Sequence, residues 1–194
     1  MIKMFKFRQS LMNNALKCLL ISGSLFMGIY AMIMPIHALF VQEIGGDLKT
    51  ASVAYTIYWL TAGLFTFLTS KIESKMKETE LAIAFSQFII TFAYIIYYFT
   101  ASPGTLYVAM FFIGLANAFF WPAYHVVFAK HTQKKYATMQ WGFFDASSYL
   151  VPAIGSLIGG FLAAKYGFDL IFIIMAVLSF LNGLFIVILP RKLL

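Results

Sequence analysis

The sequence has 194 residues, of which 62% are hydrophobic and only 11% are charged. Soluble domains carry roughly 25% charged residues, so this composition excludes a soluble protein and predicts an all-α integral membrane protein. The single cysteine, Cys18, excludes an internal disulfide and a multi-cysteine metal site. The net charge of +7 is explained below by membrane orientation, so no nucleic-acid partner is expected.

Residues 1–17 form a short arm that mixes basic and apolar side chains. This pattern predicts an amphipathic segment lying on the cytoplasmic face of an anionic membrane. No small-residue cleavage site follows a short apolar core, so the arm is not interpreted as a cleaved signal.

Six apolar segments follow, each close to the ~20 residues that a membrane-spanning helix needs. We expect them at residues 18–41, 50–70, 81–100, 104–129, 137–164 and 168–189. Together they form a six-helix transmembrane domain over residues 18–190, followed by a short tail at 191–194. Pro103 suits the first turn of the fourth helix, whereas Pro122 predicts a kink inside it.

The positions of Lys and Arg predict the orientation. Twelve of the 14 basic residues fall in the arm, the second-to-third connection, the fourth-to-fifth connection and the tail, and only Lys49 and Lys165 fall on the other side. Positive charge stays in the cytoplasm, so both the N and the C terminus are expected there. The expected location is the inner or plasma membrane of the cell.

Polar and small side chains recur at helical spacing on one face of the first, second, fourth and fifth helices. Such a stripe marks a face turned to protein or water, so these helices are expected to line a cavity, with the sixth at the periphery. The candidate cavity residues are Tyr30, His37, Asn117, Trp121, Trp141 and Tyr149. The alternatives remain open: aromatic residues also anchor interfaces, Asn117 also suits a bond to a neighbouring helix, and His37 also suits contact with headgroups.

Asp145 is the one acid deep in a predicted span, where a carboxylate is costly and usually functional. At ~1.5 Å per residue it lies roughly 12 Å into the fifth helix, and His125 lies roughly 7 Å from the same end of the fourth. We therefore interpret Asp145 and His125 as a proton- or cation-coupling pair. The alternative is an acid near the helix end that reaches the membrane interface.

The fifth helix also carries small residues four positions apart, a spacing that lets helix backbones approach closely. They include Gly155, Ser156, Gly159 and Gly160. No phosphate-cradling glycine loop, His-Glu-x-x-His motif or Ser-His-Asp grouping is found. The sequence therefore predicts a protein that is not an enzyme and that needs no metal or cofactor.

Four segments, taken in order, resemble one six-helix half of a major facilitator superfamily transporter. They are MPIHALFV with EIGGD at 34–47, the stretch from Gly114 to Trp121-Pro122-Ala123, GSLIGG at 155–160, and Tyr166-Gly167-Phe168 with Phe172. Two features depart from the family pattern. Ser156 stands where the family usually has proline, and the connection after the second helix lacks both glycines of its usual motif. The gating role of that motif is therefore not carried over.

The resemblance implies a secondary transporter of a small solute that works by alternating access, with proton coupling left open. Family members usually have twelve helices in two halves that bind substrate between them, so six helices imply a parallel homodimer. The expected partners are lipid, a second copy and the solute. Helix packing and the dimer interface are assigned to Tyr55, Trp59, Gly155, Ser156, Gly159 and Gly160. The alternatives are one half of a heterodimeric transporter, or a non-transporting accessory or assembly protein.

Overall fold

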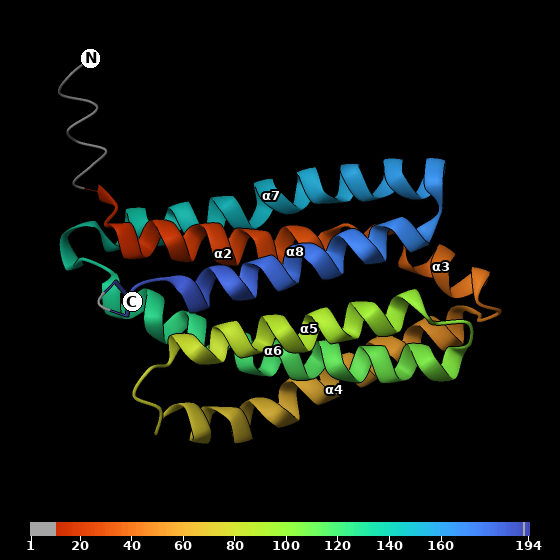
Figure 1. The fold of residues 1–194 in the computed structure, drawn as a ribbon, viewed down its shortest axis with the longest axis horizontal. Coiled ribbons are helices and arrows are strands. Elements are labelled where there is room, and N and C mark those ends of the chain that lie inside the picture. Colours follow the sequence, from red (N-terminus) through yellow and green to blue (C-terminus); the bar gives the residue numbers. More distant parts are fainter. Residues whose placement is uncertain (1–10, 192) are drawn as a thin grey trace, which may run out of the picture.

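The computed structural model describes residues 11–191 and 193–194, and this part of the chain is helical (Figure 1). Its elements are α2 (Asn14–Ala31), η1 (Met34–Ile36), α3 (His37–Glu43), α4 (Leu48–Glu73), α5 (Glu80–Tyr98), α6 (Pro103–His131), η2 (Lys134–Tyr136), α7 (Ala137–Tyr166) and α8 (Phe168–Ile188). Six helical spans in these residues are long and apolar enough to cross a membrane. The all-α, six-span fold is therefore confirmed. Most of the expected basic arm, residues 1–10, lies outside the described residues.

Local signals explain where the spans begin and turn. Asn13 starts α2, because its side chain accepts a hydrogen bond of 2.8 Å from Leu16 N. Asp47 starts α4 in the same way, accepting from Thr50 N at 2.7 Å. Gly167, with φ of +79°, makes the tight turn between α7 and α8, a conformation that favours glycine. The first span thus begins before the expected residue 18, and α4 runs past the expected residue 70 to Glu73.

The six spans pack as two groups of three that interlock. Helix α4 packs against α6 and α6 against α5, while α2 packs against both α7 and α8. The groups meet where α5 packs along α8, near the middle of Figure 1. Helix α8 joins the groups through one face, from which Asn182 donates a buried hydrogen bond of 3.0 Å to Ser22 O. Its other face exposes Ile173, Val177 and Leu181, as expected of a peripheral sixth helix.

At two prolines, the lost backbone hydrogen bond is replaced by a side chain of a neighbouring helix. Proline has no N–H, so Pro35 and Pro122 leave the carbonyls of Ala31 and Ala118 without their helical donors. The Ser156 hydroxyl donates to Ala31 O at 3.2 Å, and the Thr69 hydroxyl donates to Ala118 O at 2.7 Å. The first span breaks at η1, whereas α6 continues through Pro122.

The glycines of α7 bring two helices of the same chain together. A Cβ atom at Gly155 would collide with the backbone of Gly28 in α2, and one at Gly159 would collide with the Met32 carbonyl. Gly160, by contrast, has open space around its Cα. Gly155 and Gly159 thus belong to packing within one chain, which corrects their assignment to a dimer interface. The i, i+4 spacing predicted close approach without indicating which helix approaches.

Candidate functional site

A cavity of about 730 Å³ lies between α2, α4, α6 and α7. This volume falls in the range typical of small-molecule sites. Its wall is formed by Phe26, Met27, Tyr30, Ala31 and Met34 of the first span, Tyr58, Trp59, Ala62 and Thr66 of α4, Asn117, Trp121, Pro122 and His125 of α6, and Ser148, Tyr149 and Pro152 of α7. The four helices predicted to line a cavity are the four that do so.

Asn117 and Trp121 form a fixed polar unit in the α6 wall of the cavity. The Asn117 side chain donates to Ile113 O at 2.9 Å, and its Oδ1 accepts from Trp121 Nε1 at 3.1 Å. Both bonds lie within α6, so the alternative in which Asn117 bonds a neighbouring helix does not describe this structure. The Asn117 amide instead holds the indole of Trp121 at the cavity wall.

Aromatic rings of α2 and α4 form the facing wall. The Tyr30 and Tyr58 rings lie 6.2 Å apart, and Tyr58 also contacts Trp59, with ring centroids 4.7 Å apart. Tyr55 packs edge-on against Tyr58 at 6.4 Å and does not line the cavity. Tyr58 was missed in the sequence because the stripe was traced through Tyr55 and Trp59. Its position three residues after Tyr55 was the available signal.

Helix α7 contributes Ser148, Tyr149 and Pro152 to this wall. Pro152 has no N–H, so the Ser148 carbonyl lacks its helical donor. The corresponding carbonyls at Ala31 and Ala118 receive hydroxyl groups from other helices. No side chain of the described residues donates to Ser148 O.

Two predicted cavity residues lie elsewhere. His37 is buried outside the cavity, where its Nε2 lies 3.0 Å from the Tyr97 hydroxyl and its ring packs on Tyr55. This position does not fit contact with headgroups. Trp141 packs against Phe128, with ring centroids 4.6 Å apart, and against Phe144. These assignments failed because helical spacing gives a face of a helix and not its neighbour across the bundle.

Asp145 and His125 do not form the expected pair. Asp145 is exposed on α7, one turn from Trp141 and from Tyr149, and its carboxylate makes no hydrogen bond or ion pair with another described residue. The His125 ring instead lies 5.4 Å from the Trp121 ring and 6.2 Å from the Trp141 ring. Similar depth along the bundle therefore does not by itself bring two side chains into contact.

A second cavity adjoins the first at the end of the bundle that carries the α4–α5 connection. It measures about 470 Å³ and is lined by Ser70, Glu73, Ser74, Met76, Thr79, Pro122, His125 and Val126. Pro122 and His125 also line the larger cavity, so these two residues form the partition between them. Glu73 was missed because the predicted second helix ended at residue 70, which placed this acid in a loop.

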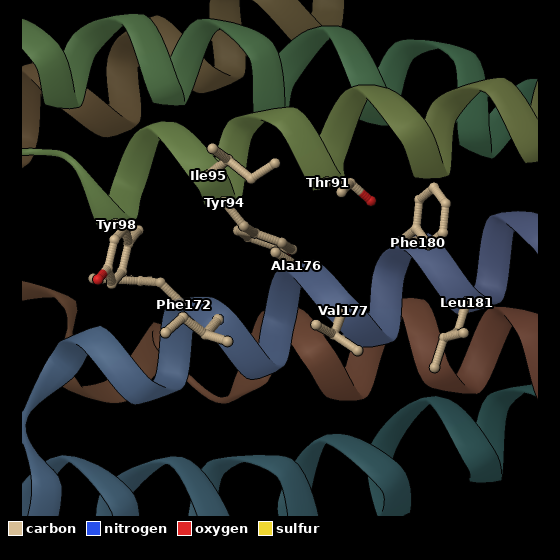
Figure 2. Close-up of a pocket in the computed structure, with 10 residues that line it drawn as sticks. Thr91, Tyr94, Ile95, Tyr98, Phe172, Ala176, Val177, Phe180 and Leu181 are labelled. Atoms are coloured by element: carbon tan, nitrogen blue, oxygen red, sulfur yellow. The ribbon is translucent and has the colours of Figure 1, made fainter.

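A third pocket, of about 380 Å³, lies on the outer side of the bundle between α5 and α8. Figure 2 shows Tyr98, Thr91 and Tyr94 of α5 facing Phe172, Val177 and Leu181 of α8 across it. Thr91 uses its hydroxyl on Gln87 O of its own helix at 2.7 Å, so the groove is apolar. It suits hydrocarbon better than a polar solute. No group of three side chains able to hold a metal ion occurs in residues 11–191 or 193–194.

Comparison with known proteins agrees with this architecture. The family model described as Major Facilitator Superfamily matches residues 19–193. The fold is similar to the in meso crystal structure of the POT family transporter PepTSo, with a TM-score of 0.70 and 14% sequence identity. That match covers 89% of this chain and 36% of the other, so this chain spans little more than a third of the matched structure. No curated protein matches the sequence.

Proposed function

The chain belongs to the Major Facilitator Superfamily, and from this premise we propose that it is part of a secondary transporter that moves a small solute by alternating access. The observation that carries the proposal is the cavity of about 730 Å³ lined by α2, α4, α6 and α7. Its walls combine aromatic rings, the Asn117–Trp121 unit and Ser148. Such a mixture binds a compact organic solute and fixes its orientation.

A second six-helix unit is proposed to close the open side of this cavity. Helices α4 and α7 are the least buried spans. They expose large apolar side chains beside the cavity, namely Trp59, Leu60, Leu64 and Phe67 on α4 and Tyr149, Leu150, Ile154, Leu157 and Phe161 on α7. The simplest second unit is another copy of this chain, related by a two-fold axis along the membrane normal. That rotation would place α4 of one copy against α7 of the other.

The proposed interface keeps some of the predicted residues and loses others. Trp59 is 65% exposed, and Gly160 is open to its surroundings, so both remain available to a partner. Ser156 is largely used within the chain through its bond to Ala31 O. The proposed interface therefore rests on large apolar side chains of α4 and α7 rather than on the glycines.

Orientation and solute class are part of the same proposal. The end of the bundle rich in Lys and Arg faces the cytoplasm, in the inner or plasma membrane, as the positive-inside rule predicts. The aromatic wall and the exposed carboxylate of Asp145 favour a lipophilic or cationic solute over an anion. Asp145 and His125 remain the proposed groups for proton or cation coupling, acting at separate positions beside the cavity.

Flux measurements test transport directly. Proteoliposomes that contain the purified chain should take up at least one member of a panel of lipophilic cations, and a pH gradient should change the rate. Liposomes without protein provide the background. If no solute in the panel moves while the protein is folded and correctly inserted, the accessory-protein alternative gains support and the transport proposal fails.

Cross-linking tests the two-fold arrangement. Leu64 and Leu150 are both exposed. Leu64 lies 16 residues after the start of α4 and Leu150 lies 16 residues before the end of α7, so both are roughly 24 Å from the same end of the bundle at 1.5 Å per residue. In a Cys18→Ser background, the Leu64→Cys/Leu150→Cys variant should form a disulfide-linked dimer in the membrane. Val177→Cys on the exposed face of α8 is the control that should not cross-link. Active protein that is strictly monomeric would exclude the homodimer.

A further inference from the structure

Glu73 is a buried acid that lies outside the polar stripes predicted from the sequence. It is the last residue of α4 and only 6% exposed, and its Oε1 atom is shielded without a hydrogen-bond partner. A buried carboxylate without donors is costly, so such a group is normally paired, protonated or functional. Lys71 and Lys75 lie close in the sequence but are exposed and do not line its pocket.

His125 connects the Glu73 pocket to the main cavity. Glu73 and His125 are the ionisable residues among the described residues that line the smaller cavity; the other lining groups are hydroxyl or apolar. Its volume of about 470 Å³ exceeds the ~30 Å³ share of one water molecule many times, so water can bridge the two side chains. On its other side, His125 faces the rings of Trp121, Trp141 and Phe144. Asp145 of α7 makes no ion pair with His125.

We propose that Glu73 and His125 form a proton relay. In this relay Glu73 exchanges protons with bulk water at the basic end of the bundle, and His125 carries them across the partition to the solute cavity. In the forward step the Glu73 carboxylate takes a proton from bulk water and then releases it to a bridging water, which passes one to the free imidazole nitrogen of His125. Glu73 is then a carboxylate again and His125 is an imidazolium. Release of the proton from His125 into the solute cavity restores the starting state.

The relay rests on the proposed transport function but involves an acid which that proposal does not use. Asp145 stands exposed on α7, whereas Glu73 shares a cavity with His125. The relay therefore replaces the direct Asp145–His125 pair with two groups that line the same cavity. Pro122 completes the partition beside His125. The bond from Thr69, one turn before Glu73, to the carbonyl of Ala118, one turn before Pro122, holds α4 and α6 together there.

Tryptophan fluorescence tests the relay without knowledge of the solute. A protonated imidazole quenches a neighbouring indole, so a pH titration of the purified chain should show a quenching step from Trp121 and Trp141, and His125→Gln should remove it. Glu73→Gln removes a negative charge near His125, so the step should move to lower pH by about half a pH unit or more. Glu80→Gln is the matched control, because Glu80 is buried near the same end but does not line the pocket.

Transport provides the second measurement. Glu73→Gln should reduce pH-gradient-driven uptake about tenfold or more, while solute exchange at equal pH stays within about twofold. An unchanged quenching step in folded Glu73→Gln protein would overturn the relay even if the chain transports. Conversely, absence of all flux together with a shifted quenching step would reject the transport function and leave the proton link between the two residues standing.

Discussion

The Thr69 hydroxyl of α4 donates a hydrogen bond of 2.7 Å to the Ala118 carbonyl of α6, the group that Pro122 deprives of its helical donor. In the membrane interior a carbonyl freed by proline can be satisfied by a neighbouring helix, a side chain or an ordered water. At Pro122 the donor comes from α4, so this proline is accompanied by a specific interhelical contact. This contact lies beside the partition between the two cavities, where α4 and α6 must keep their register.

We predict that Thr69→Val destabilises the fold by about 0.5–1.5 kcal/mol, because the shape is kept but the Ala118 carbonyl loses its donor. The measurement is the free energy of unfolding in mixed detergent micelles. Thr56→Val is the matched control, since the Thr56 hydroxyl bonds Ser52 O of its own helix on an exposed face. An equal loss of unfolding free energy in the two variants would show that the interhelical bond stabilises the fold no more than the bond within one helix.

A second prediction concerns the glycines of α7. Gly155→Ala and Gly159→Ala should each destabilise the fold by about 1–3 kcal/mol, because the new methyl group meets the backbone of α2 or the Met32 carbonyl. Gly160→Ala should change stability by less than about 0.5 kcal/mol, since the added Cβ would have no neighbour within 4 Å outside its own helix backbone. Thermal unfolding in detergent measures all three. If Gly160→Ala instead weakened only the dimer, Gly160 would belong to the interface between copies.

The sequence predicted the features that depend on local pattern, namely the spans and the helices around the cavity. It missed the features that depend on which helix a side chain meets across the bundle. Apolar length was enough to find six spans, and polar stripes were enough to choose the four helices around the cavity. The depth of Asp145 and His125 was predicted to be similar, but depth does not specify the direction in which each side chain leaves its helix. Gly155 and Gly159 were likewise recognised as packing residues without their partner. Glu73 was not recognised as a helix residue because the predicted second span ended three residues early, a typical uncertainty for helix boundaries.

A third prediction concerns the start of α4, outside the membrane spans. The hydrogen bonds from the Thr50 N–H and hydroxyl hold the pKa of Asp47 below its ordinary value. A lowered carboxyl pKa stabilises the folded state above the pKa of the unfolded chain, roughly 3.9, and this contribution is lost as pH falls through the lower folded value. The thermal midpoint of the wild type should therefore drop in this acidic range.

Asp47→Asn separates the cap from its titration. Asparagine caps a helix about as well as aspartate but does not ionise, so this variant should keep α4 intact and lose that part of the acid sensitivity. Asp47→Ala should lower the midpoint at neutral pH as well, because the Thr50 N–H loses its acceptor. Identical pH profiles for the wild type and Asp47→Asn would show that the cap does not depend on charge.

The fourth prediction separates cavity function from stability. Asn117→Ala should weaken solute affinity by about tenfold, or ~1.4 kcal/mol, because the Trp121 indole loses the acceptor that fixes it at the cavity wall. Stability should change little, since both Asn117 bonds lie within α6. Asn182→Ala should do the reverse: the bond between α8 and Ser22 is lost, while affinity stays unchanged because Asn182 lies outside the cavity. Concentration-dependent uptake and thermal unfolding of both variants provide the comparison.

The final prediction concerns Asp145. Because its carboxylate is exposed and makes no ion pair with a described residue, Asp145→Asn should change the unfolding free energy by less than about 0.5 kcal/mol. If Asp145 binds a cationic solute, the variant should lose uptake both with and without a pH gradient. If it carries a coupling proton, only the gradient-driven part should fall, by about tenfold. Gradient-driven uptake that survives Asp145→Asn but not Glu73→Gln would assign coupling to the acid that shares a cavity with His125 and leave Asp145 with no part in coupling.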